Sequence, residues 1–214
     1  MFPLLRYFSL ISAVAISTIT SVFVYAYSHS ARLQMMELEQ QHNTVLAGAL
    51  ANALLAQHRS FIASGSQLSG NTLRGRPETL QLDRLLRQFF AGSPIQRAKI
   101  YHPNATTIYS SDFAQIGSKS DDPKLQEVLS TRRPASEFHS TRGSSAPGAV
   151  PSTRDIVESH VPIFDAKGNL FAIFELFTDV TARVGEVGNE IARIALLLLA
   201  AFGVLYVFLL TLIF

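Results

Sequence analysis

Cysteine and tryptophan are absent from the sequence, and charge is absent from two long stretches of it. Without cysteine the chain has no disulfide, no thiolate metal ligand and no thiol nucleophile, so those kinds of stabilisation and catalysis are excluded. Lysine, arginine, aspartate and glutamate are missing from residues 7–31 and 194–214. Each run reaches the ~20 residues with which a helix crosses hydrocarbon. The two runs therefore predict transmembrane helices at 7–29 and 191–214.

The first uncharged run has a second interpretation. Val24-Tyr25-Ala26 would serve as a small-residue cleavage site, so the run can instead be a cleaved signal peptide. Against this, the positive region before it is only Arg6 and the amino terminus, the apolar stretch is long, and helical sequence follows. Arg6 also favours a cytoplasmic tail at residues 1–6 by the positive-inside tendency. We therefore expect a bacterial inner-membrane protein with a periplasmic domain at 30–190.

The net charge of +2 does not indicate a nucleic-acid partner. The excess of positive charge comes entirely from Arg6 and Arg193, which lie beside the two apolar runs, and the region between them is balanced. No basic face is implied. The partner that the composition predicts is the lipid bilayer.

A long helix is predicted at residues 30–63, because this segment lacks proline, has only Gly48 as glycine, and carries an apolar stripe at helical spacing. In heptad phase the stripe includes three polar amides, which is poor for a dedicated coiled coil. The pattern favours a helix that packs on its own domain at the far end and forms a homodimer near the membrane through residues 30–61. Packing within the monomer alone is the alternative. The seam consists of Leu33, Met36, Gln40, Asn43, Ala47, Leu50, Leu54, Gln57 and Phe61.

The segment from His160 to Thr181 predicts a β-hairpin, because Asp165-Ala166-Lys167-Gly168 separates two strand-like runs. On the second arm both faces are largely apolar, which predicts a strand covered on two sides. Glu175 is the one ionisable group in this arm.

The remaining segments predict an α+β domain with a five-stranded antiparallel sheet. Residues 64–76 read as a loop, and residues 141–152, rich in glycine, serine and proline, read as a mobile surface loop. The predicted helices are 77–91 and 121–131, and the predicted strands are 98–101, 106–109, 134–140, 154–164 and 169–178.

Two segments resemble extracytoplasmic PAS-like, or Cache, sensor domains. Residues 99–117, KIYHPNATTIYSSDFAQIG, resemble an opening hairpin of that family, and residues 161–181 resemble its closing pair of strands. Such domains are flanked by two membrane helices in bacterial histidine kinases, GGDEF diguanylate cyclases and chemoreceptors. The resemblance implies a sensor domain over about 33–190. Asn104 stands where an Asp-Gly turn is commoner, and the 141–152 loop is unusually rich in glycine, serine and proline.

No motif for catalysis or for a cofactor is present in the sequence. The six histidines lack the H-x-x-x-H and H-E-x-x-H spacings of metal sites, and there is no G-x-S-x-G, phosphate-binding or dinucleotide-binding pattern. We therefore expect these residues to form neither an enzyme nor a metal site, and to bind no cofactor.

Polar groups on the predicted strands are the candidates for binding a small-molecule ligand. Each has an ordinary structural interpretation: core tyrosines, a solvated helix end at Arg133, and exposed strand histidines. Glu175 is the strongest candidate, because a carboxylate buried among apolar neighbours is costly unless it is paired. Its structural interpretation is an ion pair with an arginine of the long helix. The candidates are Tyr101, Tyr109, Ser111, Arg133, His139, His160 and Glu175.

Two functions are consistent with this organisation. The first is the sensory module of a transmembrane receptor, in which a packing change in the periplasmic domain shifts the membrane helices. Because the second apolar run ends at Phe214 without a positive flank, we expect an output domain beyond it. The alternative is a bitopic envelope assembly or docking protein that binds no small molecule.

Overall fold

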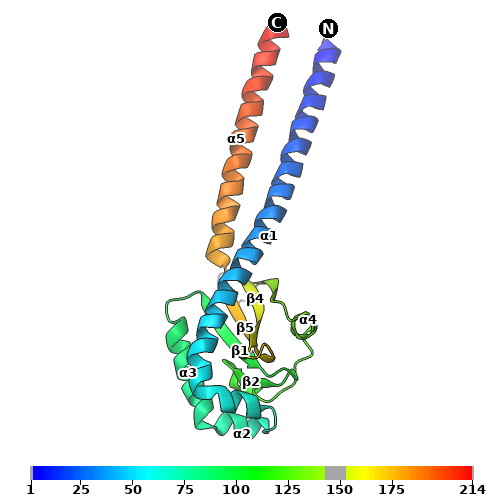
Figure 1. The fold of residues 1–214 in the computed structure, drawn as a ribbon. Coiled ribbons are helices and arrows are strands. Elements are labelled where there is room, and N and C mark those ends of the chain that lie inside the picture. The colour runs from blue at the N-terminus through cyan, green and yellow to red at the C-terminus, as the bar shows by residue number, and fades with distance from the viewer. Residues whose placement is uncertain (1, 143–152, 214) are drawn as a thin grey trace. The chain divides into compact units, whose positions relative to one another are not determined.

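The computed structural model describes residues 2–142 and 153–213. It divides into two compact units, one of residues 35–181 and one of residues 1–34 with 182–214. Helix α1, Phe2–Gly65, joins the predicted membrane helix and the predicted long helix without a break, and α5, Thr181–Ile213, ends the chain (Figure 1). By length and composition, α1 and α5 are each apolar enough to cross a membrane, over Leu10–Leu54 and Thr181–Phe208.

The predicted α+β class with a five-stranded antiparallel sheet is confirmed. The strands lie in the order β2-β1-β5-β4-β3, and all four neighbouring pairs are antiparallel. Strand β5 is therefore central, and it pairs with the first strand of the chain on one side and with its hairpin partner on the other. The strands are β1 Ile95–Tyr101, β2 Thr107–Ser110, β3 Ala135–Arg142, β4 Thr153–Phe164 and β5 Leu170–Asp179.

The β4–β5 hairpin closes at the predicted turn. The carboxylate of Asp165 accepts hydrogen bonds from the backbone N–H groups of Lys167 and Asn169, at 2.8 and 2.9 Å. Gly168 has φ +80°, a conformation that a residue with a Cβ rarely adopts. Turn chemistry in the sequence thus determines where the two longest strands reverse.

Helices cover both faces of the sheet, as the two apolar faces of β5 predicted. On one face, α1, the short α2 and α3 pack on Ile100, Val161 and Phe174 in the larger core. On the other face, α4 packs Leu125 and Val128 in a smaller core, and Figure 1 draws it on the side of the sheet away from α3. The additional helices are α2 Gly70–Gly75, α3 Pro77–Phe90, η1 Phe113–Gln115 and α4 Pro123–Thr131.

Two loop predictions are changed by the structure. Residues 64–76 are not all loop, because α2 forms there with Ser69 as its N-cap. Strand β3 continues to Arg142, so the predicted loop at 141–152 begins later; residues 143–152 lie outside the described part of the chain.

The far half of the predicted α1 seam packs on the domain itself. Ala47, Leu50 and Leu54 are at most 2% exposed in the larger core. The buried amide of Asn43 donates hydrogen bonds to the hydroxyls of Ser159 on β4 and Thr178 on β5, at 2.9 and 3.0 Å. One polar residue of the seam is therefore explained by contacts within the chain.

Candidate functional site

A polar cluster lies on the α4 face of the sheet, and the alternation of strand residues positions it. Glu158 and His160 are two apart on β4, so both point to the same face. His160 pairs in register with Glu175 on β5, and Glu175 pairs with Lys99 on β1. Three adjacent strands thus place ionisable side chains in one row across the middle of the sheet.

Glu175 is held by a lysine and a tyrosine. Its side chain is 1% exposed, and Lys99 Nζ lies 3.0 Å from its Oε2 atom. The Tyr101 hydroxyl donates a 2.6 Å hydrogen bond to the same oxygen. The expected pairing of this buried carboxylate is present, but the partner comes from the neighbouring strand and is not an arginine of the long helix. Burial and the Glu175 carboxylate both raise the pKa of Tyr101 above its usual value, so its hydroxyl remains a donor.

Glu158 lies between two histidines. The Nε2 atom of His139, on β3, is 3.2 Å from Glu158 Oε2, and Nε2 of His160 is 3.7 Å from Oε1. Burial, reinforced by the neighbouring carboxyl group of Glu175, raises the pKa of Glu158 to about 8. Because Glu158 and Glu175 are neighbouring carboxyl groups in a largely buried environment, it is costly for both to be ionised without a compensating cation.

His160 is fully buried, contrary to the interpretation of it as an exposed strand residue. Within the described part of the chain, neither of its ring nitrogens has a hydrogen-bond partner. Its ring stacks on Tyr101, with centroids 6.5 Å apart. Burial lowers the pKa of His160, so the neutral imidazole, with one free lone pair, is favoured.

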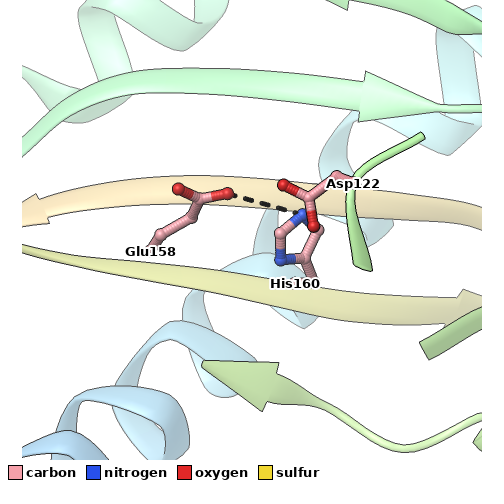
Figure 2. Close-up of side chains that lie close together, drawn as sticks. All are labelled: Asp122, Glu158 and His160. Atoms are coloured by element: carbon pink, nitrogen blue, oxygen red, sulfur yellow. Dashed lines mark ion pairs between the residues drawn. The ribbon is translucent and has the colours of Figure 1, made fainter. Parts of the chain in front are cut away.

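Asp122 approaches the same point from outside the sheet. It is the N-cap of α4, and its Oδ1 atom accepts hydrogen bonds from the N–H groups of Lys124 and Leu125. A donor atom from each of Asp122, Glu158 and His160 lies within 4.8 Å of the others. Figure 2 shows the three side chains close together, with the Glu158 carboxyl group directed at the imidazole and Asp122 drawn next to the ring.

The other sequence candidates lie elsewhere. The Tyr109 hydroxyl donates to Asp83 on α3, at 2.9 Å, on the opposite side of the sheet from α4. Ser111 bonds to the backbone of Ala98, and Arg133 is exposed just after α4. The fold therefore brings together Tyr101, His139, His160 and Glu175 from the predicted set.

Sequence reasoning missed Lys99, Asp122 and Glu158. The alternation of Glu158 and His160 was a visible signal, since two chelating residues at i and i+2 share a face of a strand. The helix predicted at 121–131 begins with Asp-Asp-Pro, but nothing in the sequence places Asp122 over β4. Only the path of the segment between β2 and α4 brings it there.

The cluster is chemically suited to binding a cation. It contains three carboxyl groups, the two imidazoles of His139 and His160, and one ammonium group, so with both imidazoles neutral and the other groups ionised it has excess negative charge. Buried groups with unsatisfied polar atoms gain most from a ligand that supplies the missing interaction.

No family model matches this sequence, and no curated protein matches it. Similar solved structures include the E. coli DcuS sensor domain, at 13% identity and TM-score 0.36, covering 61% of this chain and 97% of that one. A sensory box sensor histidine kinase from Vibrio cholerae matches at 12% identity and TM-score 0.32, covering 48% of this chain and 94% of that one. A domain of a sensory box/GGDEF family protein from Vibrio parahaemolyticus matches at 13% identity and TM-score 0.34, covering 73% of this chain and 62% of that one. All three of these structures are described as sensor or sensory box proteins, the class that residues 99–117 and 161–181 resemble.

Proposed function

We propose that this chain is the sensory module of a bacterial transmembrane signal-transduction receptor. In this proposal the helices at 7–29 and 191–214 cross the inner membrane and residues 30–190 lie in the periplasm. The polar cluster around Glu175 binds the signal, and the membrane helices pass its effect to a cytoplasmic output domain, such as a histidine kinase or a diguanylate cyclase.

The observation that carries the proposal is the short path from the cluster to α5. Strand β5 holds Glu175 in the cluster and ends at Asp179, so that only Val180 separates it from α5. The Asp179 carboxylate accepts hydrogen bonds from the N–H and hydroxyl of Thr181, and Val180 N–H donates to the Asp155 carbonyl. In this proposal a shift of β5 passes to the start of α5, because no loop separates the two elements.

A homodimer through the 30–61 helix and the membrane helices belongs to the same proposal. Signalling by paired helices needs a second copy against which a helix can rotate or slide. Leu33, a seam residue near the membrane end of the long helix, is 54% exposed, which leaves this part of the seam available to a partner.

Membrane topology is tested by labelling single cysteines in the naturally cysteine-free chain. Ala166→Cys, exposed in the hairpin turn, is expected to react with a membrane-impermeant maleimide in spheroplasts. Leu5→Cys is expected to react only after permeabilisation. The reverse pattern would place the sensor domain in the cytoplasm and overturn the proposal.

The sensory role is tested in a chimera in which residues 1–214 are joined to the kinase of a characterised receptor. Linkers of three lengths, differing by one residue, sample the helical phase at the junction. We expect Glu175→Gln to change basal output several-fold at matched membrane amounts, whereas Lys167→Gln, exposed in the hairpin turn, leaves it unchanged. Equal output from the unaltered chain, Glu175→Gln and Lys167→Gln, with every linker, would favour the assembly or docking protein.

A further inference from the structure

We propose that Asp122, Glu158 and His160 bind a divalent transition-metal ion of the Zn²⁺ type. The binding site is argued from geometry alone. Only the further statement that this ion is the signal rests on the proposed sensory function. The donor atoms lie within 4.8 Å of one another, so shifts of less than about 1 Å bring them to the ~2.0–2.2 Å bonds of Zn²⁺.

His160 is the observation that separates this site from an ordinary acidic cluster. Its imidazole is buried, stacked on Tyr101 and aimed at the two carboxyl groups, yet within the described residues its nitrogens make no hydrogen bond. A buried polar group without a partner costs free energy that a bound ion removes. Zn²⁺ takes the lone pair of a neutral imidazole as readily as carboxylate oxygen.

Charge balance indicates a dication. Asp122, Glu158 and Glu175 carry three negative charges when ionised; Lys99 offsets that of Glu175, and His139 beside Glu158 adds a positive charge only when it is protonated. One divalent ion neutralises the remaining two. A monovalent cation leaves the cluster charged, and burying that residual charge is costly.

The surrounding residues are arranged as outer support for such an ion. His139 Nε2 contacts the Glu158 oxygen opposite the one that approaches His160, and Tyr101 with Lys99 fixes Glu175 beside the site. Partners of this kind orient metal ligands and tune their affinity. The imidazole selects a transition metal over Mg²⁺ and Ca²⁺, which prefer oxygen ligands alone.

The test is Zn²⁺ binding by the purified full chain in detergent, prepared without a polyhistidine tag and stripped with chelator. We expect one tightly bound Zn²⁺ per chain by equilibrium dialysis and metal analysis, a raised melting temperature with Zn²⁺, and no comparable effect of Mg²⁺. Co²⁺ in place of Zn²⁺ gives a visible absorption band that reports the ligands directly.

Two variants and one control separate the site from adventitious binding. Asp122→Asn keeps the N-cap of α4, since asparagine caps equally well, and is expected to weaken Zn²⁺ binding at least tenfold. His160→Gln is expected to do the same and to abolish the Co²⁺ band. Asp112→Asn is the matched control, because Asp112 caps η1 in the same way outside the cluster. Absence of stoichiometric Zn²⁺, or equal affinity in all four chains, overturns the inference.

Failure of this inference is distinguishable from failure of the proposed function. If Zn²⁺ does not bind but Glu175→Gln changes the output of the chimera, the metal site is wrong and the sensory role stands. If Zn²⁺ binds with the expected variant pattern but added Zn²⁺ leaves every chimera unchanged, the site stands and its role as the signal is wrong.

Discussion

Glu175 and Lys99 face each other across β5 and β1, and their pairing determines how the domain tolerates substitution. Removing one charge of a buried pair leaves the other without compensation, whereas replacing both by apolar groups of similar volume is often neutral. Lys99 is 20% exposed, so part of its charge is solvated even without Glu175.

We expect Glu175→Leu to lower the free energy of unfolding by about 2–3 kcal/mol, because it strands the Lys99 ammonium and the Tyr101 hydroxyl. Glu175→Gln retains a hydrogen-bond acceptor and is expected to lose less, about 1–2 kcal/mol. The double variant Glu175→Leu with Lys99→Met is expected to recover at least half of the single loss. Thermal unfolding of the full chain followed by circular dichroism measures all three. An additive double variant would show that the two side chains do not interact.

His58 on α1 predicts a loss of stability in acid. Burial lowers its pKa below the ordinary 6.5, and the negative charge of Glu78 only partly opposes this effect. The unfolded chain therefore takes up a proton at a higher pH than the folded chain does. Stability is expected to fall as the pH drops below about 6.5, until the pKa of the folded state is passed.

His58→Leu removes that group, so its melting temperature is expected to fall less between pH 7.5 and pH 5.5 than that of the unaltered chain. His42→Leu is the control, because His42 lies on the same helix with a side chain that is 49% exposed. An unchanged pH response in His58→Leu would assign the acid sensitivity to other groups.

At the scale of elements, the contact of α2 with the segment after η1 depends on two glycines. Gly117 has φ +87°, and a Cβ there would collide with the Cα of Gly70. A Cβ on Gly70 would in turn come within 2.7 Å of the Ile116 carbonyl oxygen. This close approach of two backbones explains why glycine stands at both positions.

Gly117→Ala is expected to cost about 2–5 kcal/mol, combining left-handed backbone strain with a clash that forces α2 outward. Gly92→Ala is the matched control, since Gly92 has φ +79° and no atom lies within 4 Å of the place that its Cβ would take. Gly92→Ala is expected to lower the free energy of unfolding by the backbone strain alone, about 1–2 kcal/mol. Equal melting temperatures for the two variants would show that the Gly70 contact contributes nothing.

At the scale of the whole molecule, the α1 seam changes its role along its length. Leu50 is 2% exposed because it packs in the core of its own chain, whereas Leu33 is 54% exposed. The seam residues from Asn43 to Leu54 are buried in their own chain, so they are not available to a dimer interface, whereas Leu33 is.

Single cysteines test this division. Leu33→Cys and Met36→Cys are expected to cross-link between chains in membranes under mild oxidation, and Leu50→Cys is not. Leu38→Cys is the control, because Leu38 is 64% exposed and lies off the seam. Equal cross-linking at Leu33 and Leu38 would indicate random collision, and none at either would indicate a monomer.

Much of the architecture was determined by the sequence alone, because helix and strand periods, turn residues and uncharged runs are local patterns. They predicted α1, α3, α4, the five strands, the reversal at Asp165 and the unusual position of Glu175. They did not predict α2. Its Gly70 is required by close contact with the backbone of Gly117, which lies 47 positions later in the chain.

The candidate site was decided by tertiary structure. The register of β1 against β5 pairs Glu175 with Lys99, where an arginine of the long helix was expected. The segment between β2 and α4 places Asp122 beside His160. Strand order and register join residues far apart in the chain, so no local pattern records them. The sequence by itself identified Glu175 as a carboxylate that is costly to bury. Only the fold determined that Lys99 and Tyr101 are the groups that pair with it.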